Sequence, residues 1–155
     1  GGSGTIYAGT YTGMETWTLS TNMPGVPPES GTSPLTIVIA SSGDVVITDG
    51  NDFTYTGSLS GESLSAAATV EEIVVTGAYC PATTVTYTGT ISGTTITGSA
   101  NGAYDCTLTA GGTFKVTIST IFTVTRQPEA SATALGFYGN KRAILENYVR
   151  DFVGR

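Results

Sequence analysis

The chain has 155 residues, with 12 acidic side chains, 6 basic side chains, no histidine and a formal net charge of −6. Its length is that of one domain with its own hydrophobic core. The lack of histidine excludes Ser-His-Asp and Cys-His catalytic sites and imidazole zinc sites, and the negative charge argues against nucleic acid as a partner.

Period-2 alternation is the main signal along the first 126 residues, after a Gly/Ser segment (residues 1–4) that we expect to be a flexible tether. Aromatic and aliphatic residues alternate with threonine and serine, which is typical of strands with one buried and one solvated face. Short turn signals between the runs indicate antiparallel hairpins. The predicted strands are residues 7–20, 35–40, 45–48, 53–59, 63–76, 83–92, 94–100, 103–109 and 113–125.

A repeated pattern favours an up-and-down order of these strands. Residues 54–64 align with residues 86–96, and residues 10–13 are a shorter copy. Each copy has a glycine on its inward face, where a missing side chain lets a sheet bend sharply enough to close a barrel. These glycines are Gly13, Gly57 and Gly89. The predicted fold is therefore all-β, an antiparallel up-and-down barrel of about 8–10 strands over residues 5–126, followed by a C-terminal amphipathic helix.

Residues 21–34 interrupt the strand pattern. They contain four of the six prolines, so we expect a long irregular loop. A loop of this length in a small domain is either a lid or a disordered segment.

The C-terminal residues differ in charge and periodicity from the barrel. Residues 1–125 contain nine acidic side chains and one basic one, whereas residues 126–155 contain three acidic and five basic ones. Apolar pairs recur at helical spacing in residues 140–155, so we predict an amphipathic helix there, joined by a linker over residues 127–139. The helix would pack on the barrel, mediate self-association or dock on a protein partner, or be an unrelated extension.

Cys80 and Cys106 form an even pair in a chain rich in threonine and glycine and poor in charge. We associate such a surface with exported proteins, so we expect a disulfide and an extracellular, periplasmic or outer-surface location. Two free buried thiols in a cytosolic protein are the alternative. We expect no metal site, because two cysteines without histidine cannot complete a tetrahedral zinc shell.

Four inward-facing residues are the candidate ligand-binding site. Alternation places Glu15 on the same face as Trp17, and a carboxylate there must be paired or be part of a site. A bulge at Gly13 would instead turn Glu15 toward solvent. Tyr55 and Tyr87 would line the same pocket or simply pack in the core.

Two other acidic groups have simpler explanations. Residues 49–52 (Asp-Gly-Asn-Asp) have enough oxygens to suggest Ca²⁺ but lack the later glutamate of an EF-hand loop, so an Asx-rich hairpin turn explains them better. Glu71 and Glu72 are adjacent and therefore lie on opposite faces of an extended strand, which disfavours a catalytic carboxylate pair. We expect no catalytic residues and no cofactor.

At residues 86–98 and at the closing segment 122–126, Phe-Thr-Val-Thr-Arg, the chain resembles the small lipocalin-like β-barrel domains of bacterial secreted proteins and lipoproteins. The resemblance covers about residues 5–126. It implies a barrel with one blocked end, one open end and a cavity for a small apolar ligand. The expected function is a secreted or surface-tethered, non-catalytic binding module for a small apolar or amphipathic ligand. The alternative is a structural or assembly subunit of the cell envelope or of an extracellular filament.

Overall fold

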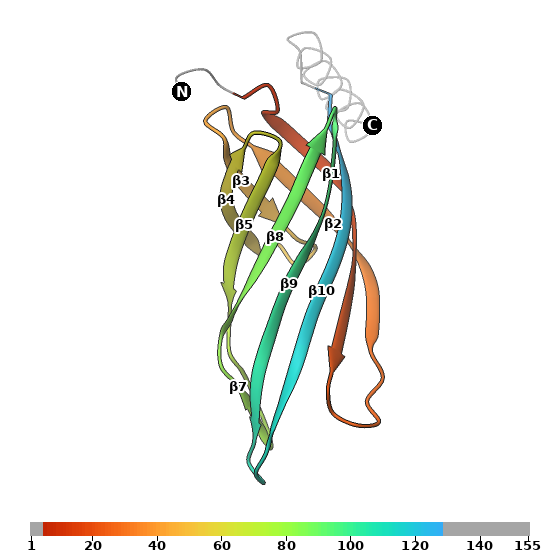
Figure 1. Ribbon diagram of the computed structural model, residues 1–155, viewed down its shortest axis with the longest axis vertical. Coiled ribbons are helices and arrows are strands. Elements are labelled where there is room, and N and C mark those ends of the chain that lie inside the picture. Colours follow the sequence, from red (N-terminus) through yellow and green to blue (C-terminus); the bar gives the residue numbers. More distant parts are fainter. Residues whose placement is uncertain (1–4, 129–155) are drawn as a thin grey trace, which may run out of the picture.

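The structure of the protein is a computed structural model that describes residues 5–128, and these residues form ten β-strands (Figure 1). The strands are β1 (Gly9–Thr21), β2 (Glu29–Ile39), β3 (Asp44–Thr48), β4 (Thr54–Ser60), β5 (Ser63–Val70), β6 (Ile73–Val75), β7 (Ala78–Cys80), β8 (Thr83–Ser92), β9 (Thr95–Leu108) and β10 (Thr113–Arg126).

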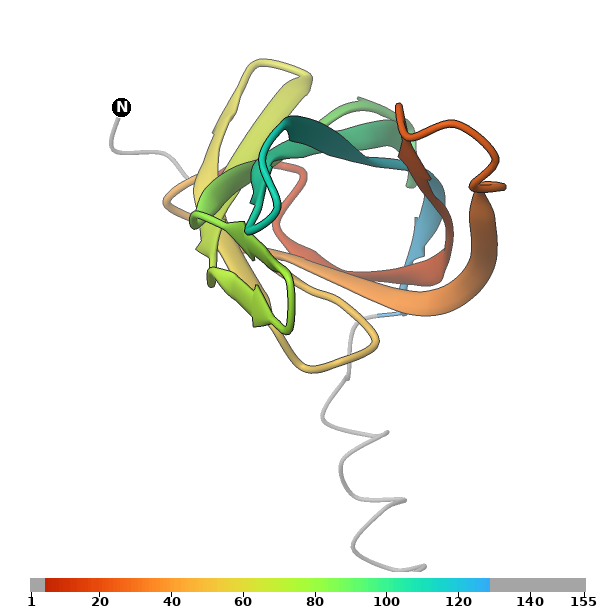
Figure 2. The same ribbon diagram turned by 90° about the horizontal axis from the view of Figure 1, so that it is seen from below.

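Eight of these strands close into an antiparallel barrel, as the strand pattern predicted. Each neighbour in the order β1-β2-β3-β4-β5-β8-β9-β10 pairs with the next, and β10 pairs back with β1. Seen along the barrel in Figure 2, these strands form a ring. The predicted up-and-down order is confirmed, because successive barrel strands are neighbours. This closed barrel is also consistent with the lipocalin-like resemblance.

The two short strands β6 and β7 form a hairpin outside the barrel. β7 pairs with the end of β9, and β6 is the last strand of the sheet. A disulfide between Cys80 and Cys106 joins β7 to β9, with a Cα–Cα distance of 4.2 Å. Both half-cystines are buried and form a second small core cluster with Tyr104. The expected disulfide is therefore present, and the free-thiol alternative is wrong.

The prediction of an irregular loop over residues 21–34 is wrong for its second half. Residues 29–34 belong to β2 and pair with β1, from Leu19↔Glu29 to Met14↔Pro34. A strand tolerates Pro34 here because β3 begins to pair with β2 only at Thr36, so this stretch of β2 has a neighbour on one side only. Pairing with β1 satisfies the backbone and outweighs the turn-like composition.

Two predicted strand boundaries are also wrong. We expected a turn at Asn101-Gly102, but β9 continues through it, because β10 pairs with β9 without a break from Thr95 to Thr107. We also expected one strand over residues 63–76. Instead, β5 ends at Val70, and the two residues Glu71 and Glu72 connect it to β6. The short strand β7 was not predicted, because residues 78–80 lie between two predicted strands. The other strands differ from the predictions only at their ends.

One half of the barrel is filled by side chains. At one end of the barrel, the Tyr11 hydroxyl donates to the Tyr7 carbonyl oxygen (2.8 Å), and Tyr7 packs on the core. The side chains less than 3% exposed in the main core include Tyr11, Leu35, Ile37, Ile39, Val45, Ile47, Ile91, Ile96 and Val124. This end is blocked, so any internal space lies in the other half.

Several predictions concern segments outside the described residues. The N-terminal tether (residues 1–4), most of the linker (residues 127–139) and the C-terminal helix (residues 140–155) belong to this group. Within residues 5–128, no helix has the length and apolar character needed to cross a membrane.

Candidate functional site

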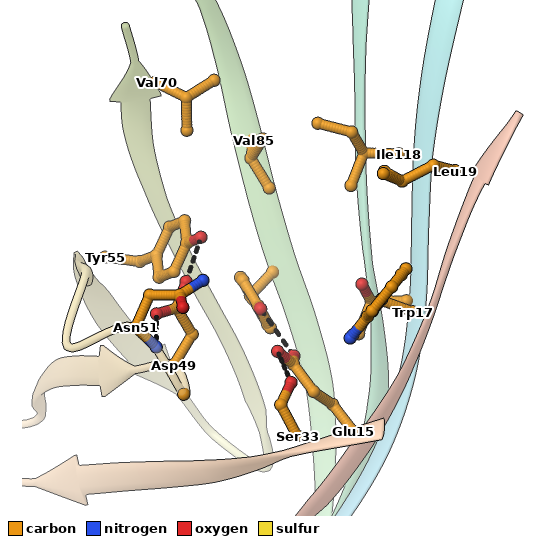
Figure 3. A pocket seen from close by; sticks show the side chains of 13 residues that line it. Glu15, Trp17, Leu19, Ser33, Asp49, Asn51, Tyr55, Val70, Val85 and Ile118 are labelled. Carbon is orange, nitrogen blue, oxygen red and sulfur yellow. Dashed lines mark hydrogen bonds between the residues drawn. The ribbon is translucent and has the colours of Figure 1, made fainter. Parts of the chain in front are cut away.

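A cavity of about 290 Å³ occupies the half of the barrel opposite the blocked end (Figure 3). Its lining residues come from β1, β2, β5, β8, β10, from the start of β4, and from the turn between β3 and β4. An eight-stranded barrel is just wide enough to be filled by side chains or to hold one small ligand. The volume is near the lower limit for small-molecule sites.

Glu15 lies at the inner end of this cavity. It belongs to β1, where it pairs with Ser33 of β2 and Phe122 of β10. The β1–β10 register runs unbroken from Tyr11 to Thr21, so there is no bulge at Gly13 and the alternation holds. The Glu15 side chain therefore points inward and is only 5% exposed. The alternative placement of Glu15 in solvent is wrong.

The buried carboxylate has two hydrogen-bond donors. The Tyr87 hydroxyl donates to Glu15 Oε2 (2.7 Å), and the Ser33 hydroxyl donates to Oε1 (3.4 Å). Burial raises the pKa of the Glu15 carboxyl above its ordinary value, and the negative charge of Asp49 raises it further, whereas these two hydrogen bonds lower it. The cavity therefore contains an acid whose ionisation responds to what binds beside it.

A second carboxylate, Asp49, lines the same cavity at the turn between β3 and β4. Its Oδ1 accepts the backbone N–H groups of Asn51 (2.9 Å) and Phe53 (3.1 Å), which makes the Asx turn that we expected. Its Oδ2 accepts the Tyr55 hydroxyl (2.9 Å). Burial and then this hydrogen bond raise the pKa of Tyr55, so the tyrosine stays a protonated donor.

Aromatic rings form opposite walls of the cavity. Tyr55 and Tyr87 lie on one wall, with ring centroids 4.6 Å apart. Trp17 stands opposite Tyr55 (Figure 3). Its indole crosses β2 at Gly31, where a Cβ atom would lie 2.4 Å from the ring. Gly31 therefore makes the space in which Trp17 is held beside the cavity.

The lining is polar at the inner end and apolar toward the mouth. Figure 3 shows Leu19, Val70, Val85 and Ile118 on the side away from Glu15. Leu19 lies near the end of β1, and Val70 is the last residue of β5, so this side faces the open end of the barrel. A molecule with one polar end and one apolar end matches this lining.

All four candidate residues, Glu15, Trp17, Tyr55 and Tyr87, line this one cavity. Their proposed contact with a ligand stays a prediction. Two cavity residues, Ser33 and Asp49, were not predicted, because Ser33 lies in the segment predicted as an irregular loop and Asp49 lies in a predicted turn. Glu71 and Glu72 do not line the cavity. The Glu72 carboxylate instead accepts the Tyr79 hydroxyl (2.7 Å).

We expect Glu15→Gln to stabilise the protein at neutral pH. A carboxyl whose pKa is higher in the folded state than its ordinary value of 4.5 keeps a proton that the unfolded chain releases. The free energy of unfolding of the wild type therefore falls as pH rises from about 4.5 through the raised pKa of Glu15, and this loss is absent from the variant. Denaturant unfolding at a series of pH values measures the difference in the free energy of unfolding between the variant and the wild type. Each tenfold ratio between the acid dissociation constants of Glu15 in the unfolded and folded states corresponds to about 1.4 kcal/mol.

Glu29→Gln is the matched control, because Glu29 is an exposed glutamate on β2. It should change the free energy of unfolding by less than about 0.5 kcal/mol across the same pH range. The excess in free energy of unfolding of Glu15→Gln over the wild type should grow as the pH rises. An excess that stays constant would contradict the effect of burial on the pKa of Glu15.

No protein-family model matches this chain, and no curated protein matches it either. What the cavity can bind is therefore inferred from its own residues. The geometry offers a deep carboxylate, hydroxyl donors, aromatic walls and an apolar mouth.

Proposed function

We propose that the protein is a non-catalytic binding module that holds one small apolar or amphipathic ligand in the barrel cavity. The observation that carries the proposal is a 290 Å³ space inside a barrel whose other half is filled by side chains. Small-molecule sites are concave, largely preformed spaces lined by apolar and aromatic side chains with a few polar groups, and this space, which opens at the mouth of the barrel, has that form.

The disulfide supports a location outside the cytoplasm. Disulfides persist in oxidising compartments and are rare among cytosolic proteins. The bond between Cys80 and Cys106 therefore favours a secreted or surface-tethered protein. A binding module in that setting would take its ligand from the surrounding medium or from a neighbouring membrane.

Assembly into an envelope or filament structure is the second candidate function. It is favoured by β6, the last strand of the sheet, where Ile73, Val74 and Val75 are all exposed. An apolar sheet edge can pair with another chain. Native mass spectrometry of the intact protein separates the two functions: a retained small molecule supports binding, whereas a concentration-dependent multimer without one supports assembly.

We expect Ile118→Phe to block the cavity. Ile118 lies on β10 and lines the apolar mouth, so a larger side chain there occupies the ligand space. The neutral fluorescent probe N-phenylnaphthylamine should bind the wild type with increased emission. Its affinity for the variant should fall by about tenfold or more, which corresponds to about 1.4 kcal/mol.

Ile121→Phe is the control on the same strand. Ile121 has the same side chain but points outward and is 65% exposed. This variant should bind the probe within about twofold of the wild type, because a surface substitution leaves the interior unchanged. Equal probe binding by both variants would place the probe outside the cavity and count against the proposal.

A further inference from the structure

Among residues 5–128, the side chains that line the cavity include acidic groups but no basic group. Glu15 and Asp49 both line it. Residues 5–128 contain two basic side chains. Lys115 lies 3.5 Å from Asp105 with more than half of its side chain exposed, and Arg126 donates to the Ile6 carbonyl oxygen at the blocked end (3.2 Å). Neither is a cavity residue, so no positive side chain of the described chain balances the two carboxylates there.

Both carboxylates keep unused acceptor positions. An ionised carboxylate has about four lone-pair sites. Glu15 accepts one hydrogen bond from Tyr87 and one from Ser33, which leaves about half of its sites. Asp49 accepts three hydrogen bonds, two from backbone N–H groups and one from Tyr55. A ligand with several N–H donors can therefore bind between them without displacing a protein donor.

The aromatic walls also favour a cation. The faces of tryptophan and tyrosine rings attract ammonium groups within about 6 Å of the ring centre, more strongly where water is excluded. Trp17 and Tyr55 stand on opposite sides of the cavity, with Asp49 and Glu15 deeper in the same space (Figure 3). Rings and carboxylates thus surround the polar inner end, while the mouth beyond it is apolar.

We infer that the ligand is a small lipophilic amine, bound with its ammonium group between Glu15 and Asp49 and its apolar part toward Leu19, Val85 and Ile118. This inference rests on the proposed binding function. The ammonium group supplies a positive charge that none of the described lining residues provides, and it donates to the unused carboxylate acceptors. An engineered apolar cavity of about 150 Å³ binds benzene, so 290 Å³ accommodates an aromatic ring together with a short aminoalkyl chain. The net negative charge of the barrel would also attract cations from solution.

Three probes with one skeleton test the charge preference: phenethylamine, phenethyl alcohol and phenylacetate. Trp17 is the single tryptophan of the chain and lines the cavity, so its emission reports binding at this site. At neutral pH, phenethylamine should bind the wild type about tenfold or more tighter than the alcohol, and phenylacetate should bind most weakly. Equal or tighter binding of the alcohol or of phenylacetate would overturn the inference.

Glu15→Gln separates the carboxylate charge from the shape of the site. The amide keeps an oxygen for the Tyr87 donor. We expect the preference for phenethylamine over phenethyl alcohol to fall about fivefold or more in this variant. The control Glu29→Gln, at an exposed glutamate outside the cavity, should leave the affinities for both probes within about twofold of the wild type. An unchanged preference for the amine would remove Glu15 as its anchor and overturn the inference.

The test also distinguishes this inference from the function on which it rests. If N-phenylnaphthylamine binds the cavity but phenethylamine shows no preference over the alcohol, the cation inference fails and the binding function stands. If neither N-phenylnaphthylamine nor any phenyl probe binds, both fail.

Discussion

The Gly57→Ala protein should lose about 3 kcal/mol or more of its free energy of unfolding. Gly57 lies on β4 and pairs with Ala66 of β5. A Cβ atom at Gly57 would lie 1.8 Å from the Ser65 carbonyl oxygen and 2.6 Å from the Ala66 Cα atom. These are backbone atoms, which cannot rotate away as a side chain does. One methyl group therefore has to push β4 and β5 apart, and the barrel wall must open.

Denaturant unfolding of Gly57→Ala beside Ser58→Ala measures this effect. Ser58 is the next residue on β4 and is exposed, so its substitution should change the free energy of unfolding by less than about 0.5 kcal/mol. A Gly57→Ala protein as stable as the Ser58→Ala control would contradict the close approach of β4 and β5 at Gly57.

Replacing both half-cystines with alanine should cost about 2–4 kcal/mol of stability. Cys80 and Cys106 are 26 residues apart in sequence, so the bond restricts a long loop in the unfolded chain. In the folded protein it fixes the β6–β7 hairpin to β9, where only two residue pairs, Ala78↔Leu108 and Tyr79↔Thr107, join β7 to the barrel.

Thermal unfolding with and without a reductant measures the loss, and hydrogen exchange locates it. The hairpin amides should exchange faster in the double variant than those of β1 and β10, because the barrel strands keep their own pairing. Reductant should lower the stability of the wild type toward that of the double variant and leave the variant unchanged. A wild type equally stable in its reduced and oxidised forms would contradict the stabilising role of the bond.

The bending glycines show how far a local pattern leads. The repeat singled out Gly13, Gly57 and Gly89 as sites where the sheet bends. At Gly13 and Gly57 a Cβ atom would strike the backbone of the neighbouring strand, at 2.1 Å and 1.8 Å. At Gly89 it would meet the Ile96 and Phe122 side chains instead, at 3.1 Å and 3.2 Å. At Gly98, which pairs with Gly89, a Cβ atom would instead strike the backbone of the neighbouring strand. This crowding depends on how β8 pairs with β9, which no single segment of the sequence specifies.

Strand alternation was a reliable guide to the inward face, because side chains of an extended strand point to opposite sides whatever the strand pairs with. It therefore placed Glu15, Trp17, Tyr55 and Tyr87 inside the barrel. The short turns between consecutive strands indicated antiparallel hairpins, since a short connection leaves neighbouring strands antiparallel, and the repeat of residues 54–64 in residues 86–96 indicated the up-and-down order.

What the sequence by itself determined is therefore the class of fold, the inward residues and the cysteine pair. Only the tertiary structure decided where the barrel is filled and where it is hollow, because a cavity depends on the summed volume of side chains from many strands. It also decided that Ser33 and Asp49 join Glu15. Residues 29–34 become a strand only because β1 offers them hydrogen-bond partners, and the β3–β4 turn meets the cavity only once the barrel has closed.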